Sequence, residues 1–295
     1  MEGECAMTVG FIGFGEAASS IALGLHEEGV TDILCYDAMQ EDSRYRDRIE
    51  EKIHACGGTK EENPGDVCRK AEVVISAVPS DRAVSAAEAA AEGIREGLLF
   101  LDVSTASPAE KRTIGAMVEE KGALFIDGAM LGALLRDKHR VPMLLSGKGA
   151  QALKEKMDPY HMKLEIVEGE PGTATSIKFI RSITAKGLSC LLIESLRAAQ
   201  KFGVEQLIVD SFLDSYGADF IRIIDGYVSG AILHAERREH EMQNVVDFLK
   251  SESLPCTMAE AARQELERLR DERVKDRFEG GVPREWRKVL DEWNL

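Results

Sequence analysis

TVGFIGFGEAASSIALGLHEEG, residues 8–29, is the stretch that decides the fold of this 295-residue chain. A short apolar run typical of a buried strand leads into the turn GFGEAA at residues 13–18, and an apolar helical pattern follows. In such a turn the first glycine permits a tight bend, the second leaves room for a pyrophosphate, and a small sixth residue lets helix and strand pack closely. Free N–H groups at the start of the helix favour phosphate binding. The sequence therefore predicts a dinucleotide site, with a merely structural glycine turn as the alternative; its residues are Gly13, Phe14, Gly15, Glu16 and Ala17.

The next apolar run ends in ILCYDAMQ, which places Asp37 about 20 residues past the glycines, the usual distance in a dinucleotide-binding unit. A carboxylate at this position accepts hydrogen bonds from ribose hydroxyls and repels a 2′-phosphate. The first arginines after it are Arg44 and Arg46. NAD is therefore favoured as the cofactor, with NADP possible. The alternative is that Asp37 only initiates a turn, as aspartates at strand ends often do.

Further short apolar runs alternate with helical patterns through the first half of the chain, at residues 32–37, 71–79, 98–104, 123–130, 141–147 and 163–169. Continuous apolar strands between helices are typical of a parallel sheet that is covered on both faces. We therefore predict an α/β fold whose N-terminal domain, residues 1–168, is a Rossmann-type, doubly wound, mostly parallel sheet that binds the dinucleotide.

Past residue 168 the pattern becomes helical. Apolar side chains recur at helical spacing from about residue 173 to residue 200, and the rest of the chain is helical in pattern, with Pro255 and Pro283 at joints. The sequence predicts an all-α C-terminal domain over residues 169–295.

Composition limits the partners. The formal net charge is −15 and the pI is about 5.0, which argues against a nucleic acid or an anionic membrane as partner. The apolar runs fall far short of the roughly 20 residues that span a bilayer, and the start, MEGECAM, is acidic where a signal peptide is basic. A cytoplasmic location is expected.

The six cysteines include no C-x-x-C pair, so neither a metal site nor a disulfide framework is expected.

A basic stripe stands out against this acidic background. The stretch TATSIKFIRSITAKG, residues 173–187, places Lys178, Arg181 and Lys186 within an arc of roughly 140° on one helix. The opposite side is expected to pack; it carries Phe179, Ile180, Ile183, Leu188 and Leu191. Small residues between the cations leave room for a small carboxylate or phosphate. The alternative is a solvated helix face.

Several segments resemble, in order and across nearly the whole chain, the β-hydroxyacid dehydrogenase family, which includes the 3-hydroxyisobutyrate, tartronate semialdehyde and 6-phosphogluconate dehydrogenases. VGFIGFGEAA resembles its cofactor fingerprint, VVISAVPS its loop beside the nicotinamide, and LDVSTASP its D-x-S-T-x-x-P substrate segment. IDGAMLGA stands where the family has a glycine loop, and GTATSIKFIRS where it has its catalytic lysine. The resemblance implies cofactor contacts from Val78, Pro79 and Ser80, substrate contacts from Ser104, Thr105 and Gly132, and a catalytic Lys178.

The departures from the family pattern concern the substrate. Arg181 and Ser182 replace the usual Asn-Asn pair, and Ala185 stands where 6-phosphogluconate dehydrogenases have a glutamate, so oxidation of phosphogluconate is not expected. The K-x-x-R-S-x-x-x-K-G pattern and HAERREHEM, residues 234–242, are similar to a less characterised subgroup that carries a phosphogluconate dehydrogenase label. The basic side chains of this stretch either add to an anion pocket or contact a partner subunit, or they are solvated or pair with nearby acids such as Glu236 and Glu241; they are His234, Arg237, Arg238 and His240.

The resemblance thus implies an NAD(P)-dependent oxidoreductase that transfers hydride to or from a small acidic β-hydroxy compound. Lys178 would take the hydroxyl proton, with burial and neighbouring cations lowering its pKa. Arg181 and Ser182 would select the anion, and Gly132 would allow close approach to the substrate. Ser104 and Thr105 would hold the substrate or, alternatively, cap the helix that begins at Pro108.

Two rival functions stay open. Related folds reduce imines, although those enzymes generally replace the lysine that Lys178 retains. A non-catalytic dinucleotide-binding sensor would use the same crevice. The resemblance also implies a homo-oligomer, dimer or tetramer.

Overall fold

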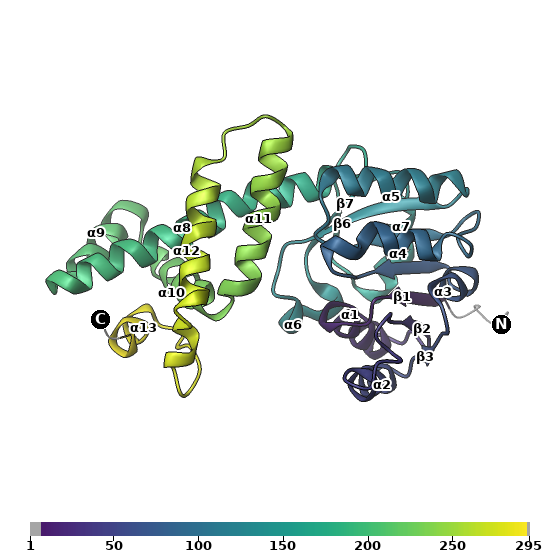
Figure 1. Ribbon diagram of the computed structural model, residues 1–295, viewed down its shortest axis with the longest axis horizontal. Helices are drawn as coiled ribbons and strands as arrows, with labels where there is room; N and C mark the ends of the chain where they lie inside the picture. The colour runs from purple at the N-terminus through teal and green to yellow at the C-terminus, as the bar shows by residue number, and fades with distance from the viewer. Residues whose placement is uncertain (1–6, 294–295) are drawn as a thin grey trace. The chain divides into compact units, whose positions relative to one another are not determined.

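The computed structural model describes residues 7–293 and consists of two compact units, Met1–Lys178 and Phe179–Leu295 (Figure 1). The division falls inside helix α8 (Thr173–Phe202), so the first residues of that helix belong with the sheet. The predicted boundary after residue 168 lies earlier, because it follows the change in sequence pattern, whereas the start of α8 is held by contacts with the strands.

The first unit is built on one eight-stranded sheet with the order β3-β2-β1-β4-β5-β6-β7-β8. All neighbouring strands are parallel except β6 and β7, which are antiparallel. The strands are β1 (Thr8–Ile12), β2 (Asp32–Tyr36), β3 (Thr59–Lys60), β4 (Val73–Ser76), β5 (Leu99–Asp102), β6 (Leu124–Met130), β7 (Met143–Ser146) and β8 (Leu164–Ile166). All seven predicted strands are confirmed. β3 is an additional two-residue edge strand, which the sequence did not predict because both of its side chains are exposed and polar.

Helices cover both faces of this sheet, as predicted for a doubly wound domain. Residues of α1 (Glu16–Glu27), α2 (Arg46–Ala55) and α7 (Ala150–Met157) join one buried apolar core. Residues of α3 (Pro64–Lys70), α4 (Ala83–Ala90) and α5 (Pro108–Glu120) join a second one. Successive residues of β1 alternate between these cores, with Phe11 in the first and Ile12 in the second. The strand order reverses between β1 and β4, which is where open α/β sheets bind ligands.

The second unit is helical, as predicted. It contains most of α8 together with α9 (Glu205–Tyr216), α10 (Phe220–Leu233), α11 (Ala235–Ser251), α12 (Thr257–Asp271) and α13 (Trp286–Glu292). Every one of these helices contributes buried side chains to a single apolar core. Within residues 7–293, no helix is both long enough and apolar enough to cross a membrane.

Candidate functional site

The turn after β1 is shaped by Gly13. Its φ of 79° lies in the region that favours glycine, and its N–H donates to the carbonyl of Tyr36 at 2.9 Å. A Cβ at Gly13 would stand 2.7 Å from Val78 Cγ1 and 3.0 Å from the carbonyl oxygen of Ala77. Gly13 is therefore required both by the backbone conformation and by the close approach of the loop that follows β4.

The start of α1 has the features that a dinucleotide phosphate needs. Gly15 immediately precedes the helix and is exposed, and a Cβ there would meet no heavy atom of the described residues within 4 Å. Within that part of the chain, no side chain caps the first N–H groups of α1. Uncapped N–H groups at a helix start bind anions. Phe14 is buried, whereas Glu16 is exposed and Ala17 half-buried at the same turn.

Asp37 lies directly after β2, beside this turn. Its Oδ2 accepts a hydrogen bond from the N–H of Phe14 at 2.7 Å, and its Oδ1 accepts one from the N–H of Met39 at 2.8 Å. The bond from the N–H of Met39 shows that Asp37 does initiate a turn, which was the alternative role considered from the sequence. The carboxylate is half-buried and each oxygen can accept a further bond, so a role toward the ribose stays compatible with this contact.

The loops after β4 and β5 carry the next predicted residues. Val78, Pro79 and Ser80 follow β4, and Val78 contacts the Gly13 turn as described above. After β5, the N–H of Ser104 donates to Asp102 Oδ1 at 2.7 Å. These loops follow neighbouring parallel strands, so they lie at the same edge of the sheet.

The cap of α5 is Ser107, not Ser104 or Thr105. The Ser107 hydroxyl accepts a bond from the N–H of Glu110 at 3.2 Å, and the Glu110 carboxylate accepts one from the N–H of Ser107 at 2.7 Å. This reciprocal capping box satisfies the start of the helix. The alternative in which Ser104 or Thr105 caps that helix is therefore wrong.

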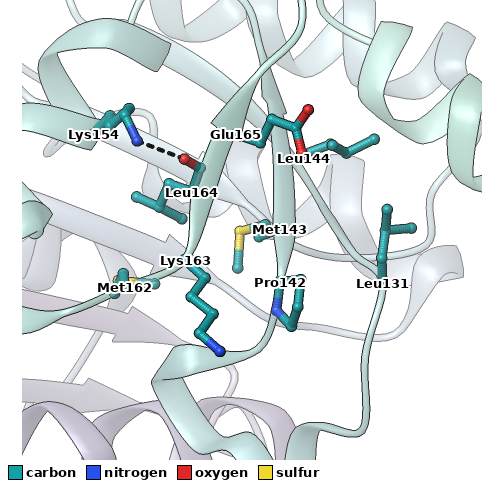
Figure 2. A pocket seen from close by; sticks show the side chains of 9 residues that line it. All are labelled: Leu131, Pro142, Met143, Leu144, Lys154, Met162, Lys163, Leu164 and Glu165. Carbon is teal, nitrogen blue, oxygen red and sulfur yellow. Dashed lines mark hydrogen bonds between the residues drawn. The ribbon is translucent and has the colours of Figure 1, made fainter.

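Gly132 follows β6, and its lack of a side chain allows Val141 and Pro142 of the same chain to approach closely. A Cβ there would stand 2.9 Å from Pro142 Cδ and 3.0 Å from Val141 Cγ2. The preceding residue, Leu131, lines a hollow of about 280 Å³ at the outer end of the sheet, where Figure 2 shows Lys154 donating to the carbonyl of Leu164 at 2.8 Å. Contact of Gly132 with a substrate stays a prediction.

Three buried charged residues beneath these loops were missed by the sequence analysis. Asp102 ends β5 and is the register partner of Asp127 in β6, and Lys111 of α5 lies between them. Lys111 Nζ is 3.1 Å from Asp102 Oδ1, 3.2 Å from Asp127 Oδ1 and 2.8 Å from the carbonyl oxygen of Asp102. All three side chains are at most 1% exposed.

The two carboxylates keep Lys111 charged. Burial lowers the pKa of this lysine, but the charges of Asp102 and Asp127 raise it by more, so the pKa lies above its ordinary value. Its three N–H groups match the three nearby oxygens. The sequence did contain a signal, because Lys111 stands on the helix face that buries Ile114 and Val118.

The start of α8 is held by the same network. Asp127 Oδ2 accepts bonds from the N–H groups of Gly172 and Thr175, each at 3.0 Å, and Asp127 Oδ1 accepts one from the Thr175 hydroxyl at 2.7 Å. The Ser146 hydroxyl accepts a further bond from the N–H of Ala174 at 3.1 Å. These acceptors satisfy N–H groups that a helix leaves without partners. Lys178, half-buried, follows one turn later.

Gly172 has a steric role at this junction. Its φ is 97°, and a Cβ there would stand 2.7 Å from the carbonyl oxygen of Pro108 at the start of α5. The chain therefore enters α8 against the start of α5, and a side chain at this position would push the two apart.

Further along α8, the other two predicted cations have different surroundings. Arg181 is exposed, Ser182 is buried, and Lys186 Nζ donates to the Ser182 hydroxyl at 2.8 Å and pairs with Glu241 at 3.0 Å. Burial lowers the pKa of Lys186, and Glu241 opposes this only in part because Arg238 is also near.

The predicted packing face of α8 is partly wrong. Ile180 and Leu191 are 56% and 52% exposed, whereas Phe179 is buried. Ile183 and Leu188 pack against the core of the second unit. The apolar side chains that were predicted to pack along one side of α8 therefore lie partly in the core of the second unit and partly at the surface.

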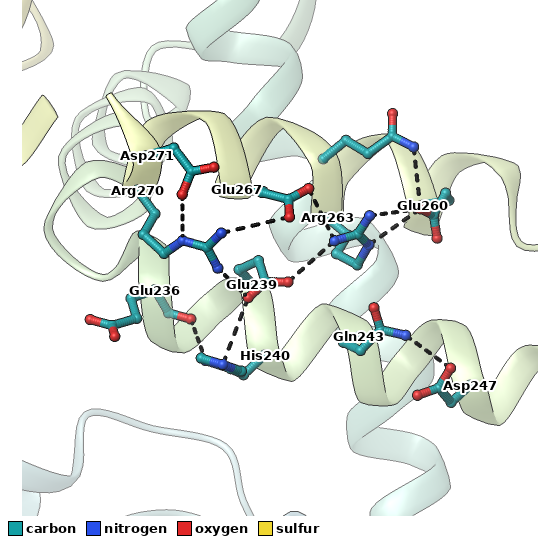
Figure 3. Close-up of polar contacts among 11 residues, drawn as sticks. Glu236, Glu239, His240, Gln243, Asp247, Glu260, Arg263, Glu267, Arg270 and Asp271 are labelled. Atoms are coloured by element: carbon teal, nitrogen blue, oxygen red, sulfur yellow. Dashed lines mark hydrogen bonds and ion pairs between the residues drawn. The ribbon is translucent and has the colours of Figure 1, made fainter. Parts of the chain in front are cut away.

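Two cations of the charged stretch 234–242 lie near acids, which was one of the predicted alternatives: Arg237 is 4.0 Å from Glu241, and His240 Nε2 is 3.9 Å from Glu239. Figure 3 shows Glu239 between Arg263 and Arg270, at 3.3 and 3.0 Å. In the same stretch, His240 Nδ1 lies 2.9 Å from the carbonyl oxygen of Glu236.

Comparison with known proteins agrees with this geometry. Residues 8–158 match the NAD binding domain of 6-phosphogluconate dehydrogenase, and residues 199–269 match a domain of unknown function, DUF1932. A conserved hypothetical protein from Sinorhizobium meliloti 1021 has a TM-score of 0.80 at 28% identity, covering 98% of this chain and 96% of that chain. A conserved protein of unknown function, described as structurally similar to 3-hydroxyacid dehydrogenases, has a TM-score of 0.76 at 30% identity, covering 91% of this chain and 98% of that one.

A named enzyme matches over a shorter range. Human mitochondrial 3-hydroxyisobutyrate dehydrogenase is 28% identical over 131 residues, which are 43% of this chain and 36% of that enzyme. The match to this enzyme therefore spans less than half of the chain, whereas the predicted sheet, helical C-terminal region and NAD(P) cofactor agree with the family model and the structural matches. The chain belongs to the β-hydroxyacid dehydrogenase family and is an NAD(P)-dependent oxidoreductase of that type.

Proposed function

We propose that this protein oxidises or forms a small acidic β-hydroxy compound, with Lys178 as the general acid/base. The observation that carries the proposal is that Lys178 lies one turn into a helix whose start is bonded to Asp127 and Ser146 of the sheet. A lysine placed in this way has a backbone position defined by the same unit that holds the cofactor turn.

In the oxidation, the C–H bond of the hydroxyl-bearing carbon breaks and its electron pair leaves as hydride, while the O–H proton passes to Lys178 Nζ and a carbonyl forms. Bound NAD(P) supplies the hydride acceptor. In the reverse direction the Lys178 ammonium polarises the carbonyl and returns the proton to its oxygen.

The same proposal assigns the substrate anion to polar groups near Lys178 in the sequence and to the loop after β5. Arg181 is exposed on α8 three residues after Lys178, and a guanidinium binds a carboxylate or phosphate with two parallel hydrogen bonds. Ser104, Thr105 and Ser182 supply hydroxyl groups, and Gly132 supplies backbone. The substrate class is therefore a small hydroxy acid with at least one anionic group.

The test is turnover of purified protein with NAD and NADP over a panel of hydroxy and keto acids. Lys178→Ala should lower kcat by about 10²- to 10⁴-fold, the usual contribution of a general acid/base, with the cofactor Kd unchanged. Lys201→Ala removes an exposed lysine from the same helix and serves as the matched control, with no expected effect.

The rival functions give different results. Unchanged turnover in Lys178→Ala would exclude the lysine mechanism. Cofactor binding without turnover of any acid would favour a non-catalytic sensor, and reduction of cyclic imines but not keto acids would favour an imine reductase.

We further propose that the protein is a homo-oligomer through its helical unit. Several large apolar side chains of that unit are exposed, with Phe202 79%, Leu207 69% and Tyr216 69% accessible. Association of two copies of the chain would remove such apolar side chains from water. Light scattering on the wild type and on Phe202→Glu would test this, and a monomeric wild type would refute it.

A further inference from the structure

Asp102, Lys111 and Asp127 form a buried triad that the proposed chemistry does not use directly. Each comes from a different element, β5, α5 and β6. Taking three charges out of water is costly unless each is paired and hydrogen-bonded. The contacts of the triad therefore show what it holds in place.

We infer that the triad is a positioning device, which keeps the start of α8, and with it Lys178, in fixed register with the Ser104–Thr105 loop. This inference rests on the proposed function, because it gives these residues the placement of the proposed acid/base and of the proposed substrate loop.

One side of the triad holds α8. Asp127 uses both carboxylate oxygens on this helix start, through the N–H groups of Gly172 and Thr175 and through the Thr175 hydroxyl. Thr175 precedes Lys178 by three residues, which is less than one helical turn. A shift of Thr175 away from Asp127 therefore shifts Lys178. The positive end of the helix dipole also favours a carboxylate at this position.

The other side holds the loop after β5. Asp102 Oδ1 accepts the N–H of Ser104 at 2.7 Å and pairs with Lys111. Among the described residues, Asp102 Oδ2 has no hydrogen-bond partner although it is buried. The hydrogen bonds of this carboxylate are therefore made by Oδ1, with Lys111 and with the start of the loop.

Lys111 connects the two sides. It contacts both carboxylates, whereas Asp102 bonds the loop and Asp127 bonds the helix. Asp102 and Asp127 are register partners on neighbouring parallel strands, so the ammonium group lies between two fixed points of the sheet. A change on one side of the triad should therefore reach the other side through Lys111.

The experiment uses the full chain with two mild variants, Asp102→Asn and Thr175→Val, and their combination. Thr175→Val keeps the shape but removes the hydroxyl, and Thr175→Ser restores it. Ser176→Ala is the matched control, because it removes a hydroxyl of the same turn that, among residues 7–293, donates to the carbonyl of Gly172 just before the helix. The measurements are kcat, the KM of substrate and cofactor, and amide hydrogen exchange of residues 104–107 and 172–178.

We expect Thr175→Val to lower kcat by about 10- to 100-fold, the cost of a small misplacement of a catalytic group. The KM of the cofactor and the folded fraction should not change. Thr175→Ser should recover kcat and Ser176→Ala should retain it. The double variant Asp102→Asn, Thr175→Val should lower kcat by a smaller factor than the product of the factors for the two single variants. Substitutions at coupled sites do not act independently.

Hydrogen exchange tests the coupling without any substrate. Asp102→Asn should speed exchange in residues 172–178, and Thr175→Val should speed it in residues 104–107. The inference would be overturned if each substitution changed exchange only in the measured segment nearest to it. It would also be overturned if the factor by which the double variant lowers kcat equalled the product of the two single factors. If the wild type has no turnover, the proposed function fails, whereas the exchange result still decides whether the triad couples these segments.

Discussion

One lysine in each unit of the protein is largely shielded from water, and the two lysines have opposite pKa shifts. Lys111 is fully buried between Asp102 and Asp127, and its pKa lies above the ordinary value. Lys186 is 15% exposed beside one carboxylate, Glu241, with Arg238 and Arg237 near, and its pKa lies below that value. Burial disfavours the charged form of both, so the number and sign of the neighbouring charges decide the outcome.

This difference separates a structural lysine from one that can change its charge. Lys111 has three oxygens for its three N–H groups, and losing its proton would leave two carboxylates without a buried cation. In the part of the chain that the structure describes, Lys186 has one carboxylate partner, and the nearby guanidinium groups favour its neutral form. The surroundings of Lys111 therefore favour its charged form, whereas those of Lys186 favour loss of its proton.

The largest effect that we expect comes from Lys111→Met. Removal of one partner from a buried ion cluster costs about 3–5 kcal/mol of unfolding free energy, because the carboxylates of Asp102 and Asp127 stay buried without their cation. Urea unfolding followed by circular dichroism measures this loss. Lys148→Met, which removes an exposed pair with Glu119 in the same unit, is the matched control and should leave the midpoint unchanged.

A companion variant tests whether charge balance is the cause. Adding Asp102→Asn to Lys111→Met leaves one buried carboxylate instead of two, so part of the lost stability should return. A double variant that is less stable than Lys111→Met would show that packing, not charge, dominates at this position.

A smaller effect is expected for Lys186→Met. Its partner Glu241 is 24% exposed and also lies 4.0 Å from Arg237, so water and a second cation remain available to it. We expect a loss of at most about 1 kcal/mol, measured in the same urea titration, because burial disfavours the charged form of Lys186 and its pKa is lowered despite Glu241. A loss equal to that of Lys111→Met would remove the distinction between the two lysines.

The smallest effect is the pH dependence of stability. Because the folded pKa of Lys186 lies below its ordinary value of 10.5, the unfolded chain binds more protons between these two values. The Lys186 contribution to the unfolding free energy therefore rises with pH in this window. Lys111 has the opposite sign, because its contribution is complete below 10.5 and is lost as the pH passes its raised folded value.

Unfolding curves of the wild type and Lys186→Met between pH 8 and pH 10 test this sign. The difference between the two proteins should widen in favour of the wild type as the pH rises. A difference that shrinks over this range would show that the folded protein favours the charged form of Lys186.

The comparison also shows what could be predicted from the sequence. Strands and the cofactor turn were predictable because their apolar runs and glycines reflect local backbone requirements, as at Gly13. The triad was not predicted, since it depends on the register of Asp102 with Asp127 and charged residues are usually exposed. The position of Lys111 on the apolar face of its helix was the one local sign. The exposure of Ile180 depends on how α8 packs, which helical periodicity does not specify.

The two glycines of the cofactor turn are under different constraints. Gly13 cannot accept a side chain because Val78 and Ala77 occupy the space, whereas Gly15 has a φ of −72° and open space around its Cβ position. A lineage of this protein that no longer needed the dinucleotide could replace Gly15 with no cost in folding but would still retain Gly13. A single substitution at residue 15 could therefore remove the cofactor site and keep the fold, whereas a substitution at residue 13 would disturb the fold itself.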